Sequence, residues 1–188
     1  MTDRHGSIRR QALVAAALDV VAEQGLKGLT HRAVDRQAEL PNGSTANLFR
    51  NRESLVRGVL EELERRSEEL WSAVPAGSLR SADDLARLLA TWLVAMLQEP
   101  NLGLTRARLT LTLSYPDEVR GGHFRLLTML ESAMAQCRIT KIKSRSRSVA
   151  AFLDGYLLHY VTVSATERAA ARQVLPPLRA LLTEGSPA

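Results

Sequence analysis

Apolar residues recur at helical spacing in nearly every segment of this 188-residue chain. In residues 7–24, for example, Leu13, Ala16, Ala17, Val20 and Val21 fall on one face of a helix. Leu and Ala dominate the composition and aromatic residues make up only 4%. This balance favours helices packed on helices over a β-sandwich, which needs β-branched and aromatic residues. We therefore predict an all-α chain of about nine helices.

Local signals give the expected boundaries of these helices. Gly25 is suited to end a first helix over 7–24, and Thr30 to cap a second over 30–37. Pro41 and Asn42 begin a third that reaches Leu48, and Asn51 caps a fourth that reaches Trp71. A linker is expected at 75–78, and Ser81 caps the next helix, which ends at Pro100. Further helices are expected over 101–114, 116–139, 148–164 and 166–184, with a basic loop over 138–147 and a kink at Pro176–Pro177.

The most informative stretch is residues 29–55, which read LTHRAVDRQAELPNGSTANLFRNRESL. Two short helices separated by a three- to four-residue break form a helix-turn-helix. The second of these helices is too short and too polar to be a core helix. Its amides and hydroxyls can bond base edges and phosphates, and Arg50 and Arg52 follow where a phosphate strand would pass.

This segment resembles the DNA-binding region of the TetR family. The matching elements are Gly25, Leu29-Thr30, Gly43-Ser44-Thr45, Phe49, and the run Arg50-Asn51-Arg52-Glu53 followed by Leu55. They cover about a quarter of the chain, and the helix count and length extend the likeness more loosely to the rest. The chain departs from the family where Glu39 replaces the usual turn glycine, and a positive φ there would be strained. Ala46 and Leu48 replace aromatics that are common near the end of the third helix, which shifts phosphate anchoring toward Thr30, Thr45, Asn47 and Arg52.

The resemblance implies an N-terminal three-helix DNA-binding domain over 1–52. A helical effector-binding and dimerisation domain follows over 53–188, with 53–73 as a connecting helix. The residues it assigns to DNA are Thr30, His31, Arg32, Asn42, Gly43, Ser44, Thr45, Asn47, Leu48, Arg50 and Arg52. Plainer interpretations stay open. The motif could serve only as a packing unit, Thr30 could act mainly as a helix cap, and His31 and Arg32 could form a solvated face. Arg4, Arg9 and Arg10 form either a basic arm or a disordered tail.

In the family the last two helices usually pair with their copies in a dimer. The residues that this implies here are Ala151, Phe152, Gly155, Leu158, His159, Ala170, Val174, Leu178 and Leu182. An effector pocket would lie between the central helices and be mostly apolar. Its candidates are Trp92, Met96, Arg106, Leu109, Leu113, Phe124, Leu127, Tyr156 and Tyr160. For both sets the alternative is ordinary intrachain core.

Other function classes find little support in the sequence. The four histidines follow no metal-ligand spacing, and Cys137 has no sequence-visible base. We see no catalytic motif and expect no enzyme, metal or cofactor. A polar, basic N-terminus and the lack of a long apolar run lead us to expect a cytoplasmic protein without a membrane partner.

A net charge of +5 and a pI near 10 suit an anionic partner such as DNA. The prediction is a homodimeric transcriptional regulator, in its fullest form a repressor that an unidentified small-molecule effector releases from a palindromic double-stranded DNA operator. Two alternatives remain. One is a helix-turn-helix regulator controlled by a partner protein, and the other is a nonspecific basic DNA-binding protein.

Overall fold

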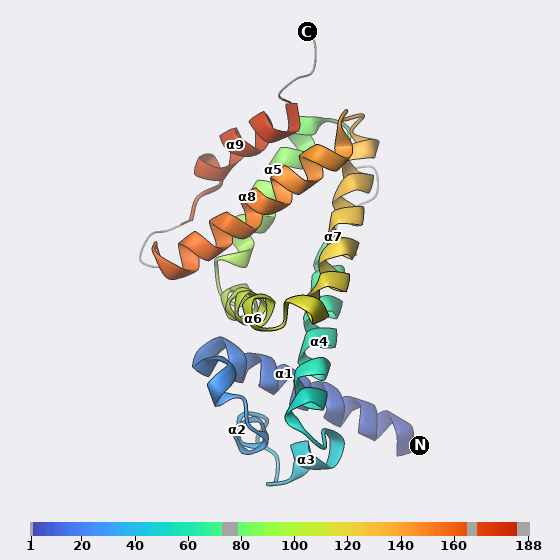
Figure 1. The fold of residues 1–188 in the computed structure, drawn as a ribbon, viewed down its shortest axis with the longest axis vertical. Coiled ribbons are helices and arrows are strands. Elements are labelled where there is room, and N and C mark those ends of the chain that lie inside the picture. The colour runs from blue at the N-terminus through green and yellow to red at the C-terminus, as the bar shows by residue number, and fades with distance from the viewer. Residues whose placement is uncertain (1, 73–78, 165–168, 184–188) are drawn as a thin grey trace. The chain divides into compact units, whose positions relative to one another are not determined.

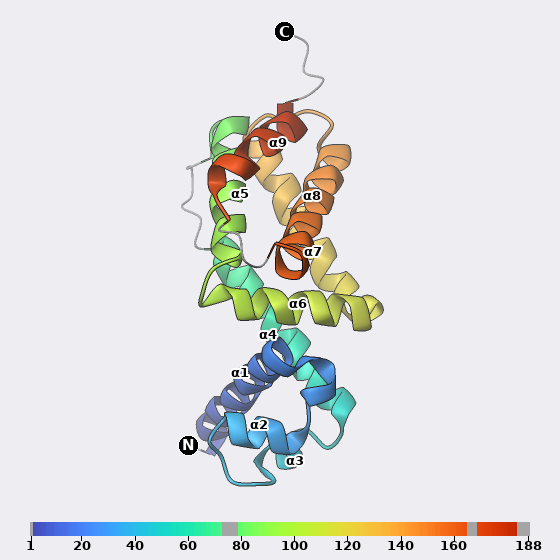
Figure 2. The same cartoon turned by 90° about the vertical axis from the view of Figure 1, so that its left-hand side faces the viewer.

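The computed structural model describes residues 2–72, 79–164 and 169–183, and the regular elements within these ranges are all helices. They are α1 (Thr2–Gly28), α2 (His31–Gln37), α3 (Ser44–Leu48), α4 (Arg52–Ser72), α5 (Ala82–Met96), α6 (Asn101–Ser114), α7 (Pro116–Gln136), α8 (Ile142–Thr162) and α9 (Ala171–Thr183). The predicted all-α class is confirmed (Figures 1 and 2). The chain forms two compact units, Met1–Leu70 with Gly103–Val119, and Trp71–Leu102 with Arg120–Ala188. These units are defined by packing, so they leave the predicted boundary between a DNA-binding and an effector-binding domain after residue 52 as a prediction.

The first unit has a core to which α1, α2, α4 and α6 all contribute. Leu13 and Val14 of α1, Val34 of α2, Leu55 of α4 and Leu111 of α6 are all almost completely buried. Burying one such side chain stabilises the fold by about 1.5–3 kcal/mol. Both views show α1 crossing α4 with α2 and α3 beside them. The two short helices are therefore carried by a packed core and do not depend on their own length for stability.

Capping side chains set several helix ends as predicted. The Thr30 hydroxyl accepts a hydrogen bond of 3.1 Å from the N–H of Ala33 and begins α2. Ser81 does the same for the N–H of Asp84 at the start of α5, also at 3.1 Å. The side-chain oxygen of Asn51 accepts from the N–H of Ser54 at 2.8 Å, directly before α4. Each cap satisfies a backbone donor that the helix itself leaves without a partner.

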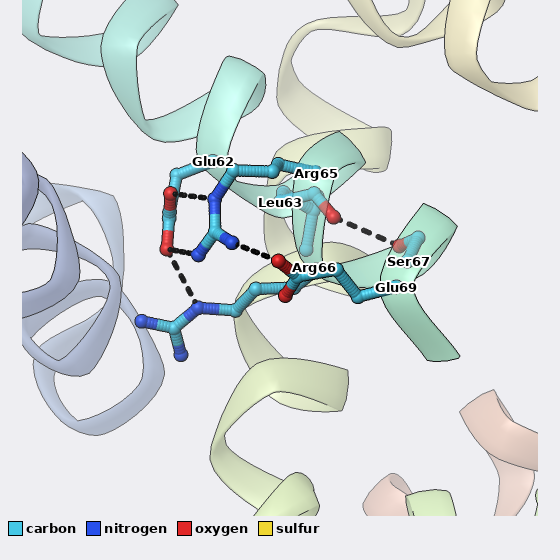
Figure 3. A network of polar contacts seen from close by, with 6 residues as sticks. All are labelled: Glu62, Leu63, Arg65, Arg66, Ser67 and Glu69. Carbon is cyan, nitrogen blue, oxygen red and sulfur yellow. Dashed lines mark hydrogen bonds and ion pairs between the residues drawn. The ribbon is translucent and has the colours of Figure 1, made fainter. Parts of the chain in front are cut away.

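A polar network lies along α4 (Figure 3). The buried carboxylate of Glu62 accepts hydrogen bonds from Arg65 at 2.6 and 2.8 Å and from Arg66 at 2.9 Å. Arg65 also pairs with Glu69 one turn further on. The hydrogen bond from Arg65 lowers the pKa of Glu62, against the opposing effect of burial and with a further contribution from Arg66. The buried negative charge of Glu62 is therefore paired with two arginines of the same helix.

In the second unit α9 packs on α5 and α8. Val174, Leu178 and Leu182 of α9 are buried, as are Leu85 and Leu89 of α5. Arg179 of α9 donates a hydrogen bond of 2.6 Å to Asp83 at the start of α5. The apolar stripe of α9 is therefore part of the core of its own unit.

The predicted basic loop over 138–147 is wrong, because α8 already begins at Ile142. Its buried side is formed by Arg145, Ser146, Val149, Leu153 and Leu157, which recur at helical spacing. The guanidinium of Arg145 is buried and donates a hydrogen bond to the carbonyl of Leu182 in α9. The sequence analysis took Arg145 for a solvated charge, and it therefore missed the first turns of this helix.

Other boundaries also differ from the predictions. The first helix begins at Thr2 and not near Ser7, so the N-terminal arginines are not in an unstructured tail. α7 ends at Gln136, three residues early. α9 begins at Ala171, so Ala170 precedes it, and it continues through Pro176 and Pro177. The predicted linker at 75–78 and the ends of the last expected helix at 166–168 and 184 lie outside the described residues.

Candidate nucleic-acid interface

The helices α2 and α3 border an open hollow of about 600 Å³ on the surface of the first unit. Its lining is formed by Thr30, His31, Arg32, Asp35, Asn42, Gly43 and Ala46. Five of these seven belong to the set that the sequence assigns to DNA. The structure thus brings together polar residues of α2 and of the turn before α3 on one concave surface, to which α3 itself contributes Ala46.

The side chains of α3 divide into an outer and an inner set. Asn47 and Leu48 are exposed, as are Asn42 before the helix and Arg50 after it. Ser44 and Thr45 are buried, and Thr45 has no exposed surface. The outer set can reach a ligand, whereas Thr45 can act only on the position of the helix.

On α2, Thr30 and Arg32 are exposed, although the Thr30 hydroxyl also serves as the helix cap. His31 is half-buried. Within the part of the chain that the structure describes, its Nε2 atom is buried without a hydrogen-bond partner. Arg32 is therefore the exposed cation of α2 that lines the hollow.

The turn between α2 and α3 uses two residues in the left-handed region. Glu39 has φ 53°, which confirms the strained conformation expected where glycine is usual. Gly43 has φ 92°, a value that glycine tolerates without cost. Because Gly43 still belongs to the turn, α3 begins at Ser44 and not at Pro41 or Asn42 as predicted. The helix is correspondingly shorter than expected.

Sequence analysis missed Asp35, a buried carboxylate that joins α2 to α3. One carboxylate oxygen accepts hydrogen bonds from the N–H and the hydroxyl of Thr45 at 2.7 and 2.6 Å. The other accepts from the N–H of Gly43 at 2.7 Å. Burial alone would raise the pKa of Asp35, but these three hydrogen bonds outweigh it and hold the pKa below its usual value. The available signal was its position directly after Val34 and three residues before Ala38, on the packed side of α2.

Two arginines of α1 also contact this region. Arg9 donates a hydrogen bond of 2.7 Å to the hydroxyl of Ser44. Arg10 pairs with Glu61 at 2.8 Å and lies over the ring of Phe49, 5.5 Å from its centroid. Arg9 therefore places a positive charge beside the first residue of α3, a contact that neither the basic arm nor the disordered tail weighed from the sequence included.

Arg52 has intramolecular partners of its own. It donates a hydrogen bond of 2.6 Å to the carbonyl of Leu29 and another to the carbonyl of Leu26. These carbonyls lie at the end of α1, where helical partners run out. Arg50, by comparison, is an exposed cation at the other side of Asn51.

The expected dimer residues fall into different environments. Ala151, Gly155, Leu158 and His159 are exposed along α8, and Phe152 is partly buried. Val174, Leu178 and Leu182 are buried within their own unit. A contact with a second copy is therefore open to α8 but not to these three residues of α9.

The expected pocket residues belong to both units. Arg106, Leu109 and Leu113 of α6 are in the first unit, and Leu113 is highly exposed. The second unit holds Trp92, Met96, Phe124, Leu127, Tyr156 and Tyr160. Met96 is buried, and the Tyr160 hydroxyl accepts a hydrogen bond from the N–H of Ala169 at 2.8 Å. The pocket stays a prediction.

Among the described residues, no helix is long and apolar enough to cross a membrane. No group of three or more His, Cys, Asp or Glu side chains among them could hold a metal ion.

Solved structures with the same arrangement of helices cover nearly the whole chain. A transcriptional regulator from Rhodococcus sp. Rha1 has a TM-score of 0.77 and 21% identity, over 94% of this chain and 96% of that chain. A member of the TetR family from Streptomyces coelicolor A3 has a TM-score of 0.71 and 24% identity, over 93% and 98%. The multidrug binding protein EbrR, complexed with imidazole, has a TM-score of 0.69 and 25% identity, over 96% and 97%. Other structures of EbrR contain ethidium, malachite green and proflavin.

No protein-family model and no curated protein matches the chain. The chain has the fold of the TetR-family transcriptional regulators.

Proposed function

We propose that this protein is a dimeric, sequence-specific DNA-binding regulator that places α3 in the major groove. The observation that carries the proposal is the division of α3 into an exposed polar side and a buried, hydrogen-bonded side. Asn42 and Asn47 present amides, which can bond adenine edges, and Leu48 presents methyl groups, which can contact thymine. A helix held rigidly from beneath can read bases with defined geometry.

Phosphate contacts in this proposal come from side chains around α3. Arg32, Arg50 and Arg9 are exposed: Arg32 lines the hollow, Arg9 contacts Ser44 at the start of α3, and Arg50 follows the end of α3. The net charge of +5 supports association with a polyanion. We assign Arg52 mainly to the end of α1 because its guanidinium donates to two carbonyls there.

Selection from random DNA tests this proposal. The purified protein is mixed with a library of random duplexes, and bound molecules are recovered and sequenced over several rounds. We expect an imperfect palindrome whose half-sites are spaced by the two reading heads of a dimer. Recovery of random sequence would contradict the proposal and favour the nonspecific alternative.

We further propose that α8 forms the contact between two copies. Leu158 is 40% exposed on the same helix as the exposed Ala151 and Gly155. Nothing lies within 4 Å of the position that a Cβ of Gly155 would occupy, so a second backbone can approach closely there. A symmetric pair would bury this face on both copies.

Sedimentation equilibrium of Leu158→Glu tests the contact. A buried carboxylate without a partner should move the protein from dimer to monomer, while Gln136→Glu, an exposed control on α7, should remain a dimer. An unchanged dimer in Leu158→Glu would contradict the role of α8.

The repressor activity and its release by a small molecule form the last part of the proposal. Support comes from EbrR, which is described as a multidrug binding protein and has been solved with three dyes. A ligand that binds the native protein raises its melting temperature, and it releases DNA only if it favours one state over the other. Melting of the protein alone with each dye, followed by release from the selected duplex, tests both steps. An unrelated helix-turn-helix protein on its own site controls for dye bound to the DNA. Binding without release would favour control by a partner protein.

A further inference from the structure

The joint between α2 and α3 consists of one buried carboxylate and three donors. Asp35, 1% exposed, accepts the N–H of Gly43 on one oxygen and both the N–H and the hydroxyl of Thr45 on the other. All three distances lie between 2.6 and 2.7 Å, typical of hydrogen bonds to a charged acceptor. A single side chain of α2 thus binds the first turn of α3 at three points.

These donors include backbone N–H groups at the beginning of a helix, which have no partner within the helix. A phosphate could otherwise bind such groups. Here the carboxylate of Asp35 already occupies the N–H of Gly43 and of Thr45. These two N–H groups therefore hold α3 on α2, and we expect side chains to bind the DNA phosphates.

The attachment matters because α3 has only five residues. A helix of this length has no stability of its own, so its orientation depends on what holds it. Beyond its first turn, α3 is held by the buried Phe49 that follows it. A small rotation about Phe49 would move the side chain of Asn47 relative to a base edge, while leaving the arginines around it able to reach phosphates.

We propose that Asp35 and Thr45 are positioning residues that fix the orientation of α3 on α2 and thereby set how well the protein distinguishes its operator from other DNA. This inference rests on the proposed function. It concerns the ratio of specific to nonspecific affinity, since neither side chain is exposed to DNA.

Removing the negative charge of Asp35 should change the affinities for operator and for unrelated DNA in different ways. Asp35→Asn retains one oxygen, but its amide nitrogen must face at least one of the three donors. The change also removes one negative charge from the lining of the hollow. Affinity for the operator should fall, whereas affinity for unrelated DNA should stay the same or rise. A role in stability alone would lower both affinities together, in proportion to the folded fraction.

The experiment uses two duplexes, one carrying the sequence that the wild-type protein selects and one with the same bases scrambled. Dissociation constants are measured for the full chain at physiological salt, and melting curves give the folded fraction of each variant. For Asp35→Asn we expect the specificity ratio to fall by about tenfold or more, the effect of losing one hydrogen bond to a charged group. Glu23→Gln, which makes the same charge change on an exposed part of α1, should keep the wild-type ratio.

A matched pair at Thr45 keeps the test decisive if Asp35→Asn does not fold. Thr45→Val removes only the hydroxyl donor from a side chain of the same shape, and Thr45→Ser retains that donor. The ratio should fall in Thr45→Val and be recovered in Thr45→Ser. A wild-type ratio in folded Asp35→Asn, or in Thr45→Val, would overturn the inference. Failure of the wild-type protein to select any sequence would instead overturn the proposed function.

Discussion

The guanidinium of Arg52 donates a hydrogen bond of 2.6 Å to the main-chain carbonyl of Leu29, 23 residues earlier in the chain. A second bond reaches the carbonyl of Leu26. The start of α4 is thereby fastened to the end of α1, beside the first residues of the helix-turn-helix. Sequence alone suggested a phosphate contact for Arg52, and that contact stays a prediction; these bonds favour a role in the scaffold on which α2 is held.

Arg52→Ala should therefore act on stability and Arg50→Ala on DNA binding. We expect Arg52→Ala to lower the free energy of unfolding by about 1–3 kcal/mol, because two carbonyls lose a charged donor. Arg50→Ala should leave the free energy of unfolding unchanged and reduce the slope of log affinity against log salt by about 1. Urea unfolding and salt titrations measure the two effects. The reverse assignment, with Arg52→Ala changing only the salt slope, would contradict this division.

Asn47→Ala should weaken binding to the selected duplex by about 1–3 kcal/mol if its amide bonds a base. Its side chain is exposed, so the free energy of unfolding should change by less than about 0.5 kcal/mol. The weakening should be confined to substitutions at one base pair of each half-site. Equal affinity of wild type and variant for the selected duplex would remove Asn47 from the reading face.

Gly58→Ala should destabilise the support of α3. A Cβ at residue 58 would lie 2.8 Å from Cε1 of the buried Phe49 ring. Overpacking of this kind costs about 1–3 kcal/mol, against a gain of roughly 0.5–1 kcal/mol from alanine in a helix. Gly103→Ala is the matched control, because a Cβ at residue 103 would lie an ordinary 3.7 Å from the Cβ of Ala22. A lower melting temperature for Gly103→Ala than for Gly58→Ala would contradict the packing argument.

Glu62 should make the protein less stable in acid. Its pKa is lowered in the folded state, chiefly by the hydrogen bond from Arg65, so the folded state favours the ionised form. The resulting stability is present above the unfolded pKa, near 4.5, and is lost as the pH falls through the folded pKa. In Glu62→Gln this loss should be smaller, at the expense of about 1 kcal/mol of stability at neutral pH. Parallel curves of unfolding free energy against pH for wild type and variant would exclude this role for Glu62.

The sequence predicted those elements whose cause is local. Thr30, Asn51 and Ser81 cap helices because a side-chain oxygen meets a nearby N–H. Gly25, with φ 66°, interrupts α1 near its end, although the helix was predicted to stop at residue 24 and continues to Gly28, and the positive φ of Glu39 turns the chain from α2 toward α3. Such interactions span a few residues and leave a readable pattern.

The sequence did not reveal interactions between residues far apart in the chain. The buried Arg145 interrupted the apolar pattern of α8, and its acceptor, the carbonyl of Leu182, lies 37 residues away. Thr45 looked like a DNA contact until its partner Asp35 was known. The stripe of Val174, Leu178 and Leu182 fitted a core and an interface equally well, since both bury apolar surface. Only the fold decides between such alternatives.

Whether α3 reads bases is decided by the specificity ratio of the wild-type protein. Its dissociation constant for the selected duplex is compared, at physiological salt, with that for the scrambled duplex. We expect a ratio of at least about 10³, as for specific regulators generally. Equal dissociation constants would contradict it, because basic charge alone would then explain all binding to DNA.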